Sequence, residues 1–344
     1  ERQGPNGFIL IFCVGGRPSF DFMSQGFCLR NHFLAIDAGS SSFWRKLMSK
    51  QKNLGPRHVL MDCSFSLNES IVERMKRLGD SYPKALVTGG TSGLGLAFCN
   101  MLLGEGVEVT TLARRSVQSS YANDLHSVQL DLCDSSAVAA FADEHLSNQG
   151  VPDLLINNAG YGAFFEWGEF PDEEISRQVE VLFTAPVRLC RAFAPAMKER
   201  GSGGIVNVTS IAGLFPLPYM PLYNGAKAAL SAFSASLSLE YNGMPFVNDF
   251  RLGDFRTDFN VSVKKMKAIP SNSSACRAWE QIEKQLNSSP EPIAAAKTLR
   301  RVLREKQDGI TYAGGFLQAR LAPLLYRLAP VGILRTILRR WYRL

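Results

Sequence analysis

The chain has only four histidines among its 344 residues, and its seven cysteines follow no regular spacing. The histidines do not stand at the short intervals typical of zinc sites, so no metal is expected. Because the cysteines are scattered and odd in number, they do not form the paired framework of a small disulfide-rich protein. We interpret them as reduced thiols and expect a cytoplasmic protein.

The sequence also lacks an apolar run long enough to span a bilayer. Residues 8–14 are apolar, whereas a transmembrane helix needs about 20 such residues. The formal net charge is +7, but there is no zinc-finger spacing and no basic stripe interleaved with aromatic residues, so no nucleic-acid partner is predicted. With 46% hydrophobic and 20% charged residues, the composition is that of an ordinary globular protein.

A glycine-rich turn is the first motif that indicates a function. Residues 86–88 are suited to a buried strand, and glycine recurs at Gly89, Gly93 and Gly95 before a helical segment. This is the layout of a dinucleotide-binding βα unit, in which glycines let the cofactor approach the backbone.

Further apolar strands end in polar residues, in the order that such a fold requires. Asp131 follows residues 127–130, Asn157 to Gly160 follow an apolar strand, and Ser210 follows residues 205–209. We predict an α/β fold with a single Rossmann-type, doubly wound parallel sheet and helices on both faces.

Ser210, Tyr223 and Lys227 supply the groups that move a proton during hydride transfer to a carbonyl. Tyr223 and Lys227 are four residues apart, which places them on one face of a helix. A cation beside a phenol favours the ionised form, so Lys227 can tune Tyr223 as an acid/base. Ser210, at the carboxyl end of a strand, can hold a substrate oxygen.

Together these motifs resemble those of the short-chain dehydrogenase/reductase family. The resemblance extends from about residue 84 to about residue 257, less distinctly to residue 314, and rests on Thr88-Gly-x-x-x-Gly93-x-Gly95, Asn157-Asn-Ala-Gly160, Ser210, Tyr223-x-x-x-Lys227 and Gly253-x-x-x-Thr257. It implies that Tyr223 is the catalytic acid/base, that Lys227 binds the nicotinamide ribose and tunes Tyr223, and that Ser210 binds the substrate oxygen.

The same resemblance implies the cofactor contacts. Asp131 would reach the adenine, and Thr257 would lie near the nicotinamide or the pyrophosphate. The expected cofactor-binding residues, apart from those that select the nucleotide, are Thr88, Gly89, Thr91, Ser92, Gly93, Leu94, Gly95, Asp131, Leu132, Asn158, Ala159, Gly160, Tyr223, Lys227 and Thr257.

The chain departs from the family pattern at two positions. Leu182 stands where the family usually has an asparagine that supports a proton relay, and leucine cannot hold a water by hydrogen bonds. Proton supply to Tyr223 must therefore use another route or run more slowly. Leu252 replaces the common proline before Gly253, which should matter little.

Cofactor selection depends on the end of the second strand, residues 107–112. A carboxylate there would repel the 2′-phosphate of NADP, but the strand is followed by Ala113, Arg114 and Arg115. Two guanidinium groups can pair with that phosphate, so we predict NADP(H) in preference to NAD(H). The alternative is that both arginines belong to a solvated strand end.

Aromatic and aliphatic residues flank the expected cleft and indicate an apolar substrate of a lipid-like, steroid-like or acyl type. We expect Ser210, Tyr223, Phe164 and Leu217 to contact it. The same apolar residues could instead serve a subunit interface. Residues 258–292 are polar around a short amphipathic piece at 278–286, and we interpret them as a mobile flap over the substrate.

We expect three parts: a leader at 1–81, a catalytic domain at 82–315 and a basic apolar helical extension at 316–344. The leader is a poorly ordered appendage, a translation of upstream sequence outside the native protein, or a fragment of something larger. The extension carries six arginines and no acidic residue. It suits an anionic membrane surface, or else it covers the cleft or packs on a second subunit.

The sequence thus predicts a reductase that interconverts a ketone or aldehyde and an alcohol, working as a homodimer or homotetramer on a small molecule. Two other classes stay open. The chain could be an NADP(H)-binding sensor or scaffold with little activity, for which Leu182 would be an early sign. It could also be an interaction protein that uses its leader to capture a partner.

Overall fold

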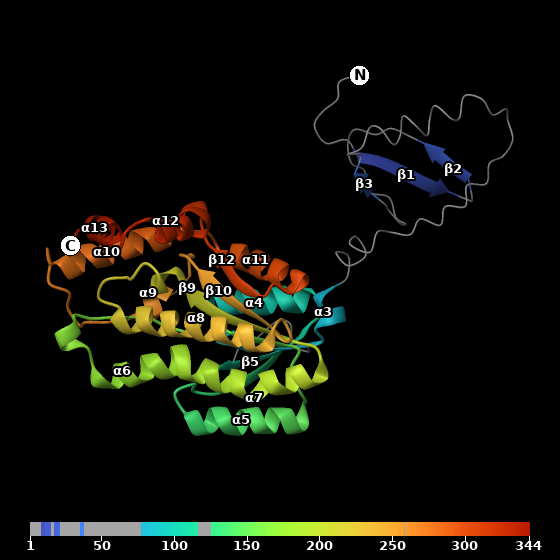
Figure 1. Cartoon of the computed structure of the whole chain (residues 1–344), viewed down its shortest axis with the longest axis horizontal. Coiled ribbons are helices and arrows are strands. Elements are labelled where there is room, and N and C mark those ends of the chain that lie inside the picture. The colour runs from blue at the N-terminus through green and yellow to red at the C-terminus, as the bar shows by residue number, and fades with distance from the viewer. Residues whose placement is uncertain (1–7, 15–16, 21–34, 38–76, 116–124, 258) are drawn as a thin grey trace, which may run out of the picture. The chain divides into compact units, whose positions relative to one another are not determined.

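The computed structural model describes residues 8–14, 17–20, 35–37, 77–115, 125–257 and 259–344 (Figure 1). The chain divides into two compact units, residues 1–66 and 67–344. In the first unit, the described strands form a three-stranded antiparallel sheet in the order β2-β1-β3: β1 (Phe8–Val14), β2 (Arg17–Phe20) and β3 (Ala35–Asp37). The apolar run at residues 8–14 is the central strand of this sheet. Most of the expected leader lies outside the described residues.

The second unit is built on a seven-stranded parallel sheet in the order β12-β10-β9-β7-β4-β5-β6. Strand β4 is the first strand of this sheet along the chain. Strands β5 and β6 follow on one side of it, and β7, β9, β10 and β12 follow on the other, so the predicted doubly wound α/β fold is confirmed. The switch point lies between β4 and β7. The strands are β4 (Lys84–Thr88), β5 (Glu108–Ala113), β6 (Leu125–Gln129), β7 (Leu154–Asn157), β9 (Gly204–Ser210), β10 (Phe246–Leu252) and β12 (Gly309–Ala313).

Helices cover both faces of this sheet, as Figure 1 shows. One face carries α4 (Gly93–Gly104) and α11 (Pro292–Glu305), which pack against each other. The other carries α5 (Ser135–Asn148), α7 (Ala185–Arg200) and α8 (Pro221–Tyr241). Leading into α7 are α6 (Asp172–Val179) and a π-helical turn, η2 (Glu180–Thr184).

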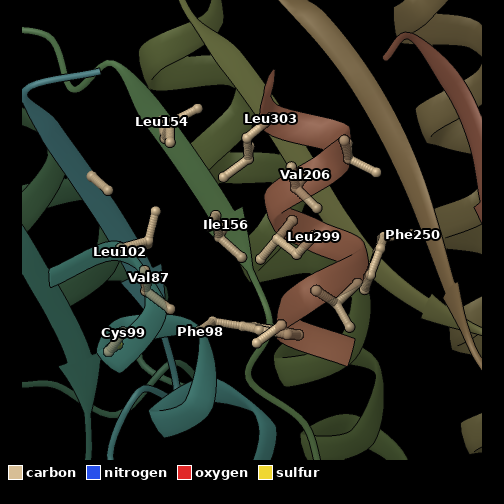
Figure 2. Packing of buried hydrophobic residues seen from close by; sticks show 14 of the residues in the cluster. Val87, Phe98, Cys99, Leu102, Leu154, Ile156, Val206, Phe250, Leu299 and Leu303 are labelled. Carbon is tan, nitrogen blue, oxygen red and sulfur yellow. The ribbon is translucent and has the colours of Figure 1, made fainter. Parts of the chain in front are cut away.

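The core between the sheet and helices α4 and α11 shows why these strands are continuous apolar runs in the sequence: side chains on both faces of such a strand are buried. Figure 2 shows Val87, Ile156 and Val206 of the sheet facing Phe98 of α4 and Leu299 of α11. All five side chains are completely buried. This packing holds the carboxyl ends of β4 and β7 beside the start of α4.

The described part of the second unit begins before residue 82, the boundary expected from the sequence. The short helix α3 (Leu78–Ser81) buries Leu78, and the backbone N–H of Gly79 donates to the carbonyl of Glu105 at 3.0 Å. Tyr82 is also buried, and its hydroxyl donates to the Leu303 carbonyl at 3.0 Å. Residues just upstream of β4 therefore belong to the folded core.

The flap and the tail expected from the sequence are largely helical. The flap contains α9 (Phe259–Ser262), a two-residue strand β11 (Lys264–Lys265) that pairs with β8 (Ala163–Phe164), and α10 (Ser274–Asn287). Helix α10 is longer than the amphipathic piece predicted at 278–286 and buries Trp279 and Ile282.

The tail consists of η4 (Leu317–Leu321), α12 (Ala322–Leu328) and α13 (Val331–Trp341). Pro323 lies in the first turn of α12, and Pro330 immediately precedes α13. Both prolines thus lie at helix beginnings, where their missing N–H removes no hydrogen bond within the helix. Short helical turns complete the fold: η1 (Trp167–Glu169) and η3 (Ile211–Gly213).

Candidate active site

The structure brings Ser210, Tyr223 and Lys227 together as the sequence predicts. Ser210 is the last residue of β9, and Tyr223 lies in the first turn of α8 with Lys227 one turn later. The hydroxyls of Ser210 and Tyr223 share a hydrogen bond. The Ser210 hydroxyl also accepts from the Ala212 N–H at 3.1 Å and lies 3.4 Å from the Leu252 carbonyl. Two hydroxyls therefore converge on one point where a carbonyl oxygen can bind.

Burial sets the electrostatics of Tyr223. It raises the pKa of the Tyr223 phenol to about 12, with a smaller contribution from the Asp254 carboxylate, while the hydrogen bond with Ser210 opposes the rise. A phenol with a high pKa remains protonated at neutral pH. Tyr223 can therefore supply a proton to a substrate oxygen.

Lys227 is buried, and its ammonium donates to the Val208 carbonyl at 2.7 Å. Burial lowers the pKa of Lys227 to about 8, and the charge of Asp249 works in the opposite direction. Lys227 is thus poised to change charge near physiological pH.

Leu182 occupies the space beside this lysine. It is fully buried in η2, and a Cβ added to Gly160 would lie 2.9 Å from Leu182 Cδ2 and 3.8 Å from Lys227 Nζ. An apolar side chain therefore packs close to the active-site lysine, and any proton relay must avoid this side of it.

The glycine turn is clamped to the end of β7 by hydrogen bonds. The Thr88 hydroxyl accepts from the backbone N–H groups of Asn158 and Ala159, both at 2.9 Å. The Asn158 amide donates to the carbonyls of Thr88 and Gly89 at 3.0 and 3.3 Å. These bonds fix the two loops on either side of the switch point, where dinucleotides bind in such sheets.

The same turn leaves no room for side chains. Gly89 has a φ of +70° and Gly93 a φ of +52°, which favour glycine. A Cβ added to Gly95 would lie 2.1 Å from the Gly89 carbonyl oxygen. Thr257 lies against Gly93, 3.5 Å from an added Cβ.

The turn suits a dinucleotide phosphate. Helix α4 begins just after Ser92, whose side chain makes no cap hydrogen bond and so leaves the first N–H groups of the helix uncapped by it. Thr91, Ser92 and Leu94 belong to this same helix start. The residues present therefore fit a nicotinamide dinucleotide.

At the adenosine end, Arg114 and Arg115 follow β5 directly and are both exposed. The Asp131 carboxylate accepts from the Cys133 N–H at 3.0 Å and pairs with Arg177 at 3.3 Å. Burial alone would raise the pKa of Asp131, but these two partners outweigh it and lower the pKa. Leu132 is buried in the core behind Asp131.

The substrate side is walled by an apolar cluster that includes Tyr223. Phe164 is fully buried and packs its ring against Tyr219 and Trp279, so it supports the wall from behind. Leu217 is only partly buried in the cluster, and Phe259 meets the Tyr223 ring edge-on at 5.9 Å between centroids. Of the two predicted wall residues, Leu217 is therefore the one nearer the surface.

Two acidic residues near the site were not identified from the sequence. Asp249 is buried in the middle of β10, where its carboxylate contacts the hydroxyls of Thr209 and Ser231 and pairs with Arg251 at 2.7 Å. Asp254 follows the same strand and lies close enough to raise the pKa of Tyr223. The sequence signal for Asp249 was a charged residue within the segment 246–250, three of whose five residues are apolar.

We expect Asp249→Asn to shift the alkaline limb of the pH–activity profile. The Asp249 charge favours the protonated form of Lys227, so its loss lowers the pKa of Lys227 below about 8. Activity that needs the ammonium should then decline at lower pH, while activity well below that limb is retained. The measurement is kcat/KM against pH. Asp308→Asn is the matched control, because Asp308 accepts from the Val247 N–H near the start of β10 and its charge is not among the causes that shift the pKa of Lys227.

Within the described residues, no group of three or more histidine, cysteine, aspartate or glutamate side chains could hold a metal. The cysteines described with their side chains, Cys99, Cys133, Cys190 and Cys276, are free thiols. A helix with the length and apolarity needed to span a membrane is not found in the described part of the chain.

Comparisons with known proteins match the region that carries this site. The family model described as short chain dehydrogenase matches residues 83–268. The chain is 30% identical over 228 residues to a 3-ketodihydrosphingosine reductase of Bacteroides thetaiotaomicron, covering 64% of this chain and 83% of that protein.

Solved structures agree. A short-chain dehydrogenase from Streptomyces avermitilis superposes with a TM-score of 0.63 at 26% identity, covering 77% of this chain and 97% of that one. L-sorbose reductase from Gluconobacter frateurii, complexed with NADPH and L-sorbose, gives a TM-score of 0.56 at 26% identity and covers 67% and 95% of the two chains. The part that the family model matches, residues 83–268, contains the glycine turn and the serine, tyrosine and lysine.

Proposed function

The chain belongs to the short-chain dehydrogenase family of nicotinamide-dependent oxidoreductases, and from this premise we propose that it is an NADP(H)-dependent reductase of a long-chain apolar ketone. The observation that carries the proposal is the position of Tyr223. Its phenol is hydrogen-bonded to Ser210 and belongs to a cluster of apolar side chains drawn from four separate parts of the chain.

The geometry supports one assignment of catalytic roles. NADPH, when bound, supplies the hydride. Ser210 holds the substrate oxygen, and Tyr223, protonated at neutral pH because of its raised pKa, donates the proton that this oxygen takes up. Lys227 stabilises the phenolate that forms, because a cation one helical turn away favours the charged state.

The preference for NADP(H) is supported by charge at the end of β5. Arg114 and Arg115 are exposed there, where their guanidinium groups can pair with a 2′-phosphate. Asp131, the first carboxylate after these arginines among the described residues, is paired with Arg177. NADP(H) in turn favours the reductive direction in a cell.

The apolar substrate is supported by the side chains around Tyr223. They include Met220, Val263 and Trp279, all buried, and Phe259 and Leu217, which are partly buried. Such walls bind long aliphatic groups through burial of apolar surface. One relative is named for the reduction of 3-ketodihydrosphingosine, a lipid ketone.

The deciding experiment measures NADPH oxidation with a series of ketones of increasing chain length. We expect kcat/KM to rise with chain length and NADPH to be preferred over NADH by at least about tenfold, the worth of one charge-assisted contact. NADPH binding without turnover of any ketone would instead favour the sensor or scaffold function. The intact arrangement of Ser210, Tyr223 and Lys227 argues against that alternative.

The C-terminal tail has two faces with different properties. Leu334 and Tyr342 are buried, and Tyr342 belongs to the apolar cluster around Tyr223. The tail therefore covers the substrate side. Most of its other side chains are exposed, and these are mostly apolar or basic, including Phe316, Leu324 and Trp341.

We propose that this exposed face contacts anionic membrane surfaces. Six exposed arginines without an acidic residue give it a positive charge, and the apolar side chains between them suit insertion among headgroups. The two interpretations of the tail are compatible, because its buried face covers the apolar cluster and its exposed face is the one that would contact a membrane.

Removing two arginines should weaken vesicle binding. Each basic residue near an anionic surface contributes about 1 kcal/mol, so Arg327→Gln with Arg340→Gln should reduce binding to phosphatidylserine vesicles on the order of 30-fold. Binding should also fall as salt rises. The matched control is Lys297→Gln with Arg301→Gln, which removes two exposed charges from α11. Equal loss in both variants, or binding insensitive to salt, would contradict membrane contact.

A further inference from the structure

A cavity of about 410 Å³ lies where the C-terminal tail meets the loop before α8 and the start of α10. Helix α13 lies beside α10 in Figure 1. The residues that line the cavity are Pro218, Tyr219, Ser274, Arg335, Arg339 and Leu344. Two of these side chains are cationic and none is acidic, so the cavity is suited to an anion.

The helical repeat of α13 places both arginines at this junction. Leu334, Leu338 and Tyr342 recur every four residues and are buried or partly buried, while the side chains between them are exposed. Arg335 and Arg339 each follow this buried stripe by one residue. They therefore lie along one border of the packed face, on one side of the helix.

Arg277 of α10 fixes the junction. Its guanidinium donates to the carbonyls of Arg343 and Asn272 at 2.9 and 2.7 Å, and to the Ser274 hydroxyl oxygen at 2.9 Å. The bond to Arg343 ties the end of the tail to α10. Because the Ser274 oxygen accepts from Arg277, its own O–H remains available as a donor in the cavity.

The two arginines of the cavity have no counter-charge. Among the residues that the structure describes, neither the Arg335 nor the Arg339 side chain has an ion-pair or hydrogen-bond partner. Like charges one helical turn apart repel each other, so the pair is unfavourable until an anion binds to it. The tail supplies no such anion, because no acidic residue follows Asp308 in the sequence.

Tyr219 forms a rigid wall between the cavity and the apolar cluster. Its φ of +62° lies in the left-handed region, which residues with a side chain seldom adopt. The Phe165 N–H donates to its carbonyl at 3.0 Å, and its ring packs against Phe164 with 5.2 Å between centroids. Backbone strain of this kind is concentrated at ligand sites. The cationic cavity thus directly adjoins an apolar cluster.

These features suit a phosphate monoester at the end of a lipid. Each guanidinium can form paired hydrogen bonds with phosphate oxygens, and a hydroxyl can donate a further one. A monoester carries roughly two negative charges at neutral pH, which two arginines balance. Ile337 and Trp341 are exposed on the same helix and provide apolar surface for acyl chains.

We propose that this cavity binds the phosphate monoester headgroup of a membrane lipid, as in phosphatidic acid. Arg335 and Arg339 bind the phosphate oxygens, and Ser274 donates a hydrogen bond to them. This inference rests on the membrane contact proposed above and names its ligand, and it does not depend on the reductase activity. A lipid is favoured over free phosphate because exposed apolar side chains lie on the same helix as the two arginines.

The test measures co-sedimentation with phosphatidylcholine vesicles that contain either phosphatidic acid or phosphatidylserine, adjusted to the same surface charge. Wild-type protein should bind the phosphatidic acid vesicles at least about tenfold more tightly, the worth of one charge-assisted contact. Arg335→Gln with Arg339→Gln should bind both kinds of vesicle equally. The matched control, Arg327→Gln with Arg340→Gln, also removes two tail arginines, and it should bind both more weakly but retain the preference.

Equal wild-type binding to both kinds of vesicle overturns the headgroup site and leaves general membrane contact standing, even if a variant proves unstable. A preference that survives in Arg335→Gln with Arg339→Gln also overturns it. If neither kind binds, the membrane contact fails, and calorimetry with a water-soluble short-chain phosphatidic acid decides the site. Equal affinities of wild-type protein and that variant then overturn it. Inorganic phosphate that binds as tightly as the short-chain lipid overturns the lipid as ligand and identifies a site for free phosphate.

Discussion

Replacing Tyr223 with phenylalanine should lower kcat for ketone reduction by about 10² to 10⁴, the usual contribution of a positioned proton donor. The phenol is the group hydrogen-bonded to Ser210, and the substitution removes only its oxygen. The ring still packs against Phe259, so the apolar wall is preserved. NADPH affinity should be nearly unchanged, because the turn proposed to bind the dinucleotide is held in place by hydrogen bonds between Thr88 and Asn158 that do not involve the phenol.

Tyr219→Phe is the matched control. Tyr219 lies four residues before Tyr223, and its ring packs on Phe164 in the same apolar cluster. This control tests whether loss of any phenol oxygen from the wall impairs turnover. Wild-type turnover by Tyr223→Phe, measured as NADPH oxidation at saturating ketone, would contradict its assignment as the acid.

The parts of the site that the sequence predicted are those governed by local rules. Buried parallel strands read as apolar runs, so β4, β7 and β9 could be recognised, and Ser210 could be placed at the carboxyl end of β9. The spacing of Tyr223 and Lys227 fixed their common face on α8. In each case, the relevant neighbours lie within a few residues along the chain.

The parts that the sequence did not predict depend on contacts between distant residues. Gln318 reaches Asp254 across 64 positions, and Tyr342 joins the cluster of Phe164 from the far end of the chain. No periodicity encodes such pairs. Phe164 is also more buried than its predicted place in the wall of the cleft requires. Its side chain is fully buried against the rings of Tyr219 and of Trp279 in α10.

Gly95→Ala should impair the dinucleotide site. The new Cβ would lie 2.1 Å from the Gly89 carbonyl oxygen and 2.5 Å from the Asn158 amide nitrogen. Both atoms belong to the clamp between the glycine turn and the end of β7, so neither can yield without moving the start of α4. Overpacking of this kind costs about 1–3 kcal/mol.

If that cost falls on the conformation that binds NADPH, the dissociation constant should rise by about 10- to 100-fold. Gly104→Ala provides the matched control, because Gly104 ends the same helix and an added Cβ would meet no atom within 4 Å. Alanine is a better helix former than glycine by about 1 kcal/mol, so this control should melt at the wild-type temperature or above. Titration of NADPH fluorescence measures both affinities. Wild-type affinity in Gly95→Ala would mean that the dinucleotide does not need the close approach of α4 to the turn, and the assignment of this turn as the phosphate cradle would be wrong.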